Sequence, residues 1–73
     1  MSFKHSERYK LIGIKISKYR MKRGLTQEQL ANDVGISYSY LTQIEAPNVV
    51  KKMSLEVLFD IADTLNVNIK DLL

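Results

Sequence analysis

A turn of only three residues, 35–37, separates two segments that both have helical patterns. A connection this short makes the chain change direction at once, so we expect one residue in it to need a positive φ. Glycine adopts that conformation without the steric cost that a Cβ imposes, and Gly35 is the residue available. Ala31, four residues earlier, is expected to face the incoming helix, where a larger side chain would push the two helices apart. The turn therefore predicts two short helices packed closely together.

Both segments beside the turn have helix-start signals. TQEQ, which begins at Thr26, has the form of a capping box, in which each side chain satisfies a free N–H of the other residue's backbone. Ser37 is the expected cap of the following helix, which should end near Glu45. Aliphatic residues at helical spacing would close a shared core: Leu30, Val34, Ile36, Leu41 and Ile44. This is the pattern of a helix-turn-helix, whose second helix is offered to the major groove of DNA, although an ordinary helix hairpin is the alternative.

The rest of the chain is also helical in pattern. Residues 9–23 have apolar positions at helical spacing, and Gly24 follows as a stop signal. Residues 46–53 are expected to form a loop, after which Ser54 caps a fourth helix and Asn68 caps a last short turn. The sequence therefore predicts an all-α domain over residues 9–73, a compact bundle of five helices, preceded by a flexible N-terminal arm at residues 1–8.

The predicted third helix has an unusual outward face. At 100° per residue, Leu41 and Ile44 define its buried direction, and Ser39, Thr42 and Gln43 point roughly the opposite way. This face is short, uncharged and able to donate and accept hydrogen bonds. Glutamine can pair bidentately with adenine, and serine or threonine can contact either base type. We therefore expect these side chains to face base edges, the alternative being a plain solvated surface.

Charge is distributed unevenly. The net charge is +3, but residues 1–52 contain ten Lys and Arg against four acids, whereas residues 53–73 contain one lysine against four acids. The basic residues 1–52 favour binding to a polyanionic partner. The acidic residues 53–73 argue against a protein that attracts polyanions over its whole surface. The alternative is a solvated charged surface with chance asymmetry.

Composition excludes several classes of protein. The chain has 73 residues and no cysteine, so neither disulfides nor a thiolate metal site can support its small core. No apolar run approaches the length of a membrane span, and the start is not a secretory signal. No catalytic set is visible, and there is little volume for a ligand cavity. We expect a cytoplasmic non-enzyme without membrane contact, cofactor, metal or small-molecule effector.

The segment TQEQLANDVGISYSYLTQIE resembles the helix-turn-helix of the Cro/cI-like (XRE) repressors. The resemblance extends from about Ile12 through SLEVLFDIADTLNV to Leu72, nearly the whole chain. It implies a lambda-repressor-like DNA-binding domain with five helices. The implied function is that of a sequence-specific double-stranded DNA-binding transcriptional regulator, a repressor acting as a dimer on a near-palindromic operator.

The resemblance also implies roles for individual residues. Arg20 and Glu45 match a family ion pair that ties the first helix to the third. The loop after Glu45 departs from the family pattern, and Pro47 within it has no N–H to donate, so phosphate contacts there are expected to shift to other loop residues. The matching positions place base reading at Tyr38, Ser39, Thr42 and Gln43, and phosphate contacts at Gln27 and Tyr40. The further expected phosphate contacts are Thr26 and, in the departing loop, Asn48, Lys51 or Lys52.

Dimer contacts are expected in the acidic C-terminal part, which is least suited to touching phosphate. The candidates are Phe59, Ile69, Leu72 and Leu73, although Ile69 and Leu72 could instead belong to the core. Regulation would come from the protein's own concentration or from a regulatory protein partner. The rival interpretation is an antitoxin-like protein-interaction module whose apolar surface would include Val49, Val50, Phe59 and Leu73. The polar face of the third helix favours DNA.

Overall fold

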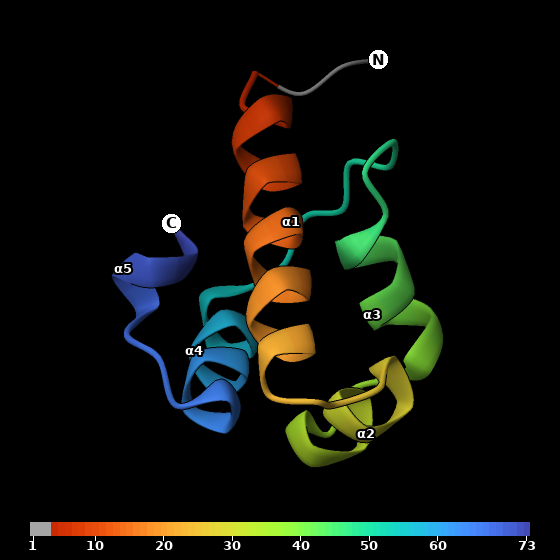
Figure 1. The fold of residues 1–73 in the computed structure, drawn as a ribbon. Helices are drawn as coiled ribbons and strands as arrows, with labels where there is room; N and C mark the ends of the chain where they lie inside the picture. The colour runs from red at the N-terminus through yellow and green to blue at the C-terminus, as the bar shows by residue number, and fades with distance from the viewer. Residues whose placement is uncertain (1–3) are drawn as a thin grey trace.

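The computed structural model describes residues 4–73, which contain five α-helices and no strand (Figure 1). This confirms the prediction of an all-α five-helix domain. None of the helices in the described part of the chain is long and apolar enough to cross a membrane. The helices are α1 (Ser6–Lys22), α2 (Gln27–Val34), α3 (Tyr38–Glu45), α4 (Leu55–Leu65) and α5 (Ile69–Leu72).

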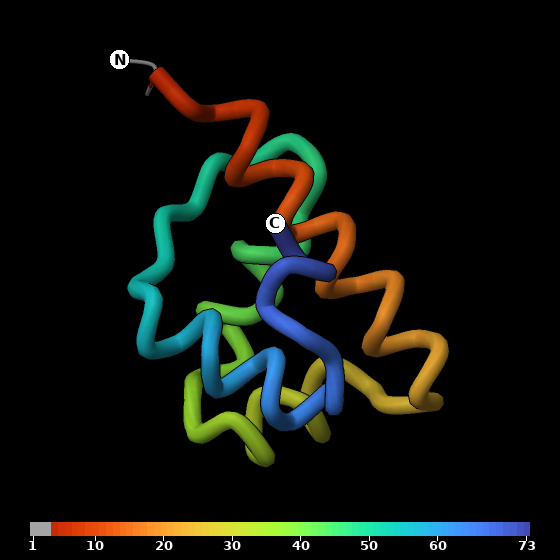
Figure 2. The backbone as a smooth tube through the Cα atoms, turned by 90° about the vertical axis from the view of Figure 1, so that its left-hand side faces the viewer, coloured from red at the N-terminus to blue at the C-terminus, as the bar shows by residue number. Residues whose placement is uncertain are grey.

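The longest helix, α1, runs through the middle of the molecule and separates α3 from the C-terminal helices. In Figure 1, α3 lies on one side of α1 and α4 and α5 on the other, with α2 near its C-terminal end. The view turned by 90° shows α5 in front, with α3 behind it (Figure 2). The helix-turn-helix formed by α2 and α3 therefore lies at one edge of the bundle.

All five helices contribute to one apolar core. Periodic aliphatic residues on each helix meet there because burying that face removes it from water. Leu72, on the single turn of α5, is fully buried, so we no longer expect it in a dimer contact, and Ile69 packs against the same core. The buried apolar residues are Ile16, Leu30, Ala31, Leu41, Ile44, Leu58, Ile61, Ala62, Leu65 and Leu72.

Four helices begin directly after a predicted cap: Thr26, Ser37, Ser54 and, before α5, Asn68. The hydroxyls of Thr26, Ser37 and Ser54 each accept a hydrogen bond from the backbone N–H three residues later. At Thr26 the capping box is complete, because the side chain of Gln29 accepts from the Thr26 N–H at 2.9 Å. These bonds satisfy donors that the first turn of a helix leaves free.

The N-terminal helix begins earlier than predicted. It starts at Ser6 instead of Tyr9, so residues 6–8 of the predicted arm belong to α1. Glu7 lies in the first turn, where a negative charge is favourable, and its carboxylate is 3.5 Å from Lys10 Nζ. Residues 4 and 5 form a turn, and residues 1–3 of the predicted arm lie outside the described residues.

The first and third helices approach each other closely at Gly13. A Cβ at this position would collide with the backbone carbonyl oxygen of Ile44 and would lie 3.6 Å from the Cα of Glu45. Gly13 is not among the residues predicted from the sequence to matter for the fold. A lone glycine inside an amphipathic helix was the available signal, because such a residue lowers helix stability and is kept where another backbone comes close.

Candidate nucleic-acid interface

The turn between α2 and α3 depends on the backbone conformation of Gly35. Its φ is 88°, in the left-handed region, and its N–H donates to the carbonyl of Ala31 at 2.9 Å. The N–H of Ile36 donates to the same carbonyl at 3.0 Å, which closes the end of α2. Ala31 itself is 1% exposed. The chain therefore leaves α2 abruptly and enters α3 after two more residues.

Gly35→Val is expected to reduce the free energy of unfolding by more than about 1 kcal/mol, because a β-branched residue at positive φ is strained. No atom lies within 4 Å of a Cβ added at Gly35, so the loss would come from backbone strain alone. Gly35→Asn is the matched control and should cost less, since asparagine tolerates this conformation. Thermal and urea unfolding measure both. A valine variant as stable as the parent would contradict the turn geometry.

The outward face of α3 presents polar groups beside its buried aliphatic face. Ser39 and Gln43 are exposed and Thr42 is half-buried, whereas Leu41 and Ile44 are in the core. Thr42 Oγ1 donates to the carbonyl of Ser39 at 2.8 Å, and Gln43 Nε2 is 3.5 Å from Ser39 Oγ. Gln43 retains its amide oxygen and a second N–H. A side chain with both groups available can pair with one base edge through two hydrogen bonds.

Tyrosines lie at the two flanks of this face. Tyr38 is exposed in the first turn of α3. Tyr40 packs against the core with its ring, and its hydroxyl lies 3.5 Å from the carbonyl oxygen of Lys52. Lys51 Nζ is 5.4 Å from the centre of the same ring. The fold thus brings together Tyr40, Lys51 and Lys52, three residues predicted to contact phosphate, while Asn48 lies in an exposed turn of the loop.

The two predicted phosphate contacts at the start of α2 make bonds within the chain. Thr26 Oγ1 accepts from the N–H of Gln29 at 3.1 Å, as part of the capping box. Gln27 Nε2 donates to Glu45 Oε1 at 3.1 Å. Sequence reasoning missed this second bond, because the two residues are 18 positions apart. Each side chain can still make further hydrogen bonds, so both can also contact phosphate. These phosphate contacts stay a prediction.

Arg20 and Glu45 form an ion pair that joins α1 to the end of α3. Arg20 Nε lies 2.9 Å from Glu45 Oε2, and Arg20 Nη2 lies 2.9 Å from Oε1. Arg20 Nη1 also donates to the carbonyl of Leu25 at 2.8 Å, in the connection between α1 and α2. The two side chains are only 12% and 3% exposed, respectively. Arg20 thereby holds three parts of the fold in register: α1, the connection before α2, and the end of α3.

No metal centre accompanies this face. Within residues 4–73, no group of three or more His, Asp or Glu side chains is arranged to hold an ion. The groups that converge at α3 are hydroxyls, amides and phenols, with lysines from the following loop. Such groups bind by hydrogen bonding and charge attraction, the two interactions used with bases and phosphates.

The short α2, the glycine turn and the exposed polar face of α3 define a helix-turn-helix domain. The model of the helix-turn-helix family matches residues 16–72, most of the chain. The chain therefore belongs to this family and is of its XRE type. This confirms the resemblance found in the sequence.

Comparison with known proteins identifies relatives within this family. The chain is 33% identical over 63 residues to the HTH-type transcriptional regulator SinR of Bacillus subtilis. That match covers 86% of this chain and 56% of SinR, so the chain spans about half the length of this curated relative.

Solved structures give the same result. The restriction-modification controller protein C.AhdI from Aeromonas hydrophila superposes with a TM-score of 0.81 at 27% identity, covering 92% of this chain and 97% of its own. SinR, the master regulator for biofilm formation, solved in complex with DNA, superposes with a TM-score of 0.77 at 33% identity. That match covers 84% of this chain and 95% of the SinR chain.

Proposed function

We propose that this protein is a transcriptional regulator that binds double-stranded DNA in a sequence-specific manner and acts as a repressor. The observation that supports this most is the face of α3, where Ser39 and Gln43 are exposed on a helix that is otherwise fixed by Leu41 and Ile44. The relatives are a transcriptional regulator, a controller protein and a regulator solved with DNA.

In this proposal, two sets of residues have different tasks. Tyr38, Ser39, Thr42 and Gln43 contact base edges, which is where sequence is discriminated. Phosphate contacts fix the register of the protein on the duplex without discriminating sequence. They come from Thr26, Gln27, Tyr40, Asn48, Lys51 and Lys52.

The functional unit in this proposal is a dimer on a near-palindromic operator. One α3 has eight residues and can reach only a few base pairs. Two copies related by a two-fold axis contact half-sites about 34–36 Å apart, one turn of the DNA helix. Together they read twice as many base pairs and so distinguish the operator better from other sequences. A regulatory protein partner stays a prediction.

The double variant Ser39→Ala, Gln43→Ala is expected to keep its melting temperature, because both side chains are exposed in the free protein. Specific binding should weaken by about 1–3 kcal/mol for each lost base contact, while non-specific binding persists. Selection from a pool of random duplexes, followed by gel shift on the selected site, measures both quantities.

Asn32→Ala is the matched control, since it removes an exposed amide from α2 and leaves α3 unchanged. If the double variant selects the same duplexes as the parent with equal affinity, α3 does not read bases in the proposed way. If the parent selects no duplex at all, the proposal of DNA binding fails, and the protein-interaction module becomes the better hypothesis.

A further inference from the structure

The third helix offers a base pair only a few kinds of chemical group. Its eight residues include no Lys or Arg, and its one charged side chain, Glu45, is buried against Arg20. The groups left on its outward face are the hydroxyl of Ser39, the side chain of Thr42 and the amide of Gln43. The commonest specific contact in the major groove is a bidentate pair from Arg or Lys to guanine. The helix α3 therefore lacks the side chains that usually recognise guanine.

The amide of Gln43 matches the major-groove edge of adenine. Adenine presents the acceptor N7 beside the donor N6–H, whereas guanine and thymine present only acceptors there and cytosine only a donor. Gln43 is exposed, and within residues 4–73 its amide oxygen has no hydrogen-bond partner. An amide that accepts and donates side by side can therefore make both bonds with adenine and only one with any other base.

Ser39 holds this amide in place. Gln43 Nε2 lies 3.5 Å from Ser39 Oγ, which is four residues earlier on the same face of the helix. An amide has two N–H groups, and pairing with adenine uses only the one beside its oxygen, so the contact with Ser39 can persist in the complex. Orienting Gln43 in advance reduces the side-chain freedom that it loses on binding. Ser39 is therefore a positioning residue for Gln43, and the proton of its own hydroxyl stays available to a base.

Thr42 offers a base its methyl group instead of a hydrogen-bond donor. Its Oγ1 donates to the carbonyl oxygen of Ser39 at 2.8 Å, so the hydroxyl proton is used within the helix. Guanine presents only acceptors in the major groove and needs a donor, which Thr42 no longer supplies. The C5-methyl of thymine makes apolar contact with a threonine methyl, and cytosine lacks this group. Thr42 therefore fits thymine.

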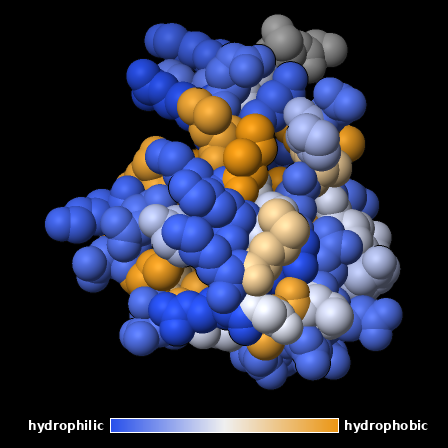
Figure 3. All heavy atoms as spheres, viewed as in Figure 1, coloured by the Kyte–Doolittle hydropathy of each residue, from blue (hydrophilic) through white to orange (hydrophobic). Residues whose placement is uncertain are grey.

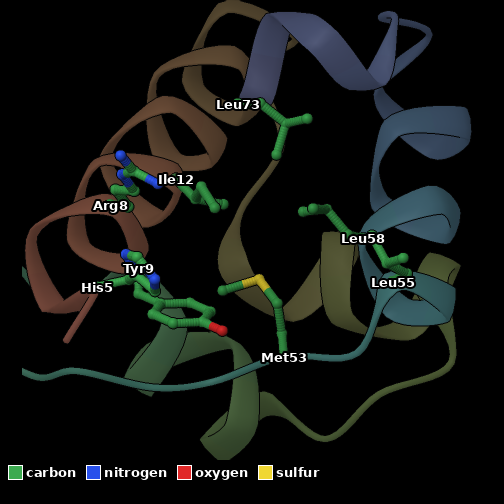
Figure 4. Close-up of a pocket in the computed structure, with 8 residues that line it drawn as sticks. All are labelled: His5, Arg8, Tyr9, Ile12, Met53, Leu55, Leu58 and Leu73. Carbon is green, nitrogen blue, oxygen red and sulfur yellow. The ribbon is translucent and has the colours of Figure 1, made fainter. Parts of the chain in front are cut away.

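The main apolar surface of the domain is separate from α3. A hollow of about 290 Å³ lies between α1, the loop before α4, the start of α4 and the C-terminal end, and no residue of α3 lines it. In the close-up, Ile12, Leu58 and Leu73 point toward one another around this hollow (Figure 4). Leu73 and Phe59, the predicted dimer contacts outside the core, are 61% and 47% exposed, and their role in a dimer stays a prediction.

Few apolar side chains are exposed on α3 itself. The space-filling view shows apolar atoms gathered over the N-terminal half of α1, with hydrophilic atoms around them (Figure 3). On α3 the one large apolar side chain that is exposed is Tyr38. The helix therefore depends mainly on the hydrogen-bonding groups of its outward face and on the methyl group of Thr42 to distinguish one base from another.

We infer that α3 reads A·T pairs in each half-site, with Gln43 on an adenine and the methyl group of Thr42 against the C5-methyl of a neighbouring thymine. Guanine beneath Gln43 would leave the amide oxygen without a partner, which is costly in a contact that excludes water. This inference rests on the proposed function, because it names the base pairs that the proposed DNA-binding face would select.

A change of side chain at position 43 locates the base pair that Gln43 reads. Selection from a pool of random duplexes is carried out with the parent and with Gln43→Arg. At one position of each half-site the variant should prefer G·C where the parent prefers A·T, because a guanidinium donates twice to guanine. Position 43 is exposed, so the melting temperature should stay that of the parent.

Modified bases in the selected duplex then test the individual contacts. Replacing the adenine by 7-deazaadenine removes only the N7 acceptor and should weaken binding about 10-fold. Replacing the neighbouring thymine by deoxyuridine removes only the methyl group and should weaken binding about 3-fold or more. Thr42→Ser, which keeps the hydroxyl and lacks the methyl group, should bind the thymine and deoxyuridine duplexes equally. Fluorescence anisotropy at one salt concentration measures all of these affinities.

Ser39→Ala tests the positioning role. It should narrow the affinity ratio between the adenine and 7-deazaadenine duplexes, and Ser39→Thr, which keeps a hydroxyl, should restore that ratio. An unchanged ratio in Ser39→Ala would overturn the positioning role. Lys52→Ala is the control, because a phosphate contact carries no sequence information. It should weaken every duplex by the same factor and leave each ratio unchanged.

The outcomes separate this inference from the proposed function. If the parent selects a duplex but Gln43→Arg changes no position from A·T to G·C, the inference is overturned and DNA binding stands. Equal affinity of the parent for the unmodified and modified duplexes has the same consequence. A parent that selects no duplex overturns both the inference and the proposed function.

Discussion

Gly13→Ala is expected to reduce the free energy of unfolding by about 3 kcal/mol or more, although alanine is the better helix former. The added Cβ would collide with the carbonyl oxygen of Ile44, which is backbone and cannot turn aside as a flexible side chain would. Relief requires α3 to move away from α1, and this movement opens the core around Ile16 and Ile44. A domain of 73 residues has little stability to lose, so the variant should be largely unfolded near 37 °C.

Lys18→Ala is the control for this experiment, because it changes an exposed site on the same helix and should alter stability by no more than about 0.5 kcal/mol. Circular dichroism during urea and thermal unfolding compares the two variants. An alanine variant at position 13 that melts with the parent or above it would show that α1 and α3 are further apart than described. The same shift of α3 should also weaken operator binding in any variant molecules that stay folded.

Glu45→Ala is expected to destabilise the domain by about 3–5 kcal/mol, because it leaves the Arg20 guanidinium without its partner in a largely buried site. The carboxylate accepts from Arg20 at 2.9 Å and from Gln27 at 3.1 Å, and the variant loses all of these bonds. Gln27→Ala removes only one of them and should cost about 1 kcal/mol. Urea unfolding gives the three free energies under identical conditions.

A double variant provides the internal comparison. Arg20→Met with Glu45→Leu removes both charges, so no unpaired ion remains, and its cost should be well below the sum of the two single changes. If the double variant loses as much free energy of unfolding as the two single variants together, Arg20 and Glu45 are not coupled. Because the pair holds the end of α3 against α1, folded molecules of the single variant should also bind operator more weakly.

Helix positions and caps could be predicted because they depend on neighbouring residues. Thr26 with Gln29, Ser37 and Ser54 satisfy donors within their own first turns, which is information contained in four consecutive positions. The start of α1 was predicted less well. His5, the residue before the helix, makes no side-chain capping bond, so no cap signal marked the helix start at Ser6.

The candidate site was predictable in part for the same reason. Periodicity alone separates the face of Ser39 and Gln43 from that of Leu41 and Ile44 on a helix of known register. The partner of Gln27 was not predictable, because its bond to Glu45 depends on how α2 lies against α3. Leu72 and Leu73 are adjacent and identical in type, yet one is fully buried and the other 61% exposed.

The sequence by itself determined the five helices, the glycine turn and the family of this protein, because capping, periodicity and φ preferences act over a few residues. Only the tertiary structure decided the close approach of Gly13 to Ile44, the bond from Gln27 to Glu45, and the apolar hollow between α1, α4 and the C-terminal end. These features join residues far apart in the chain, and their geometry depends on how whole helices pack. Local sequence determines which side chains share the outward face of α3. The packing of the helices determines how this face is oriented on the domain.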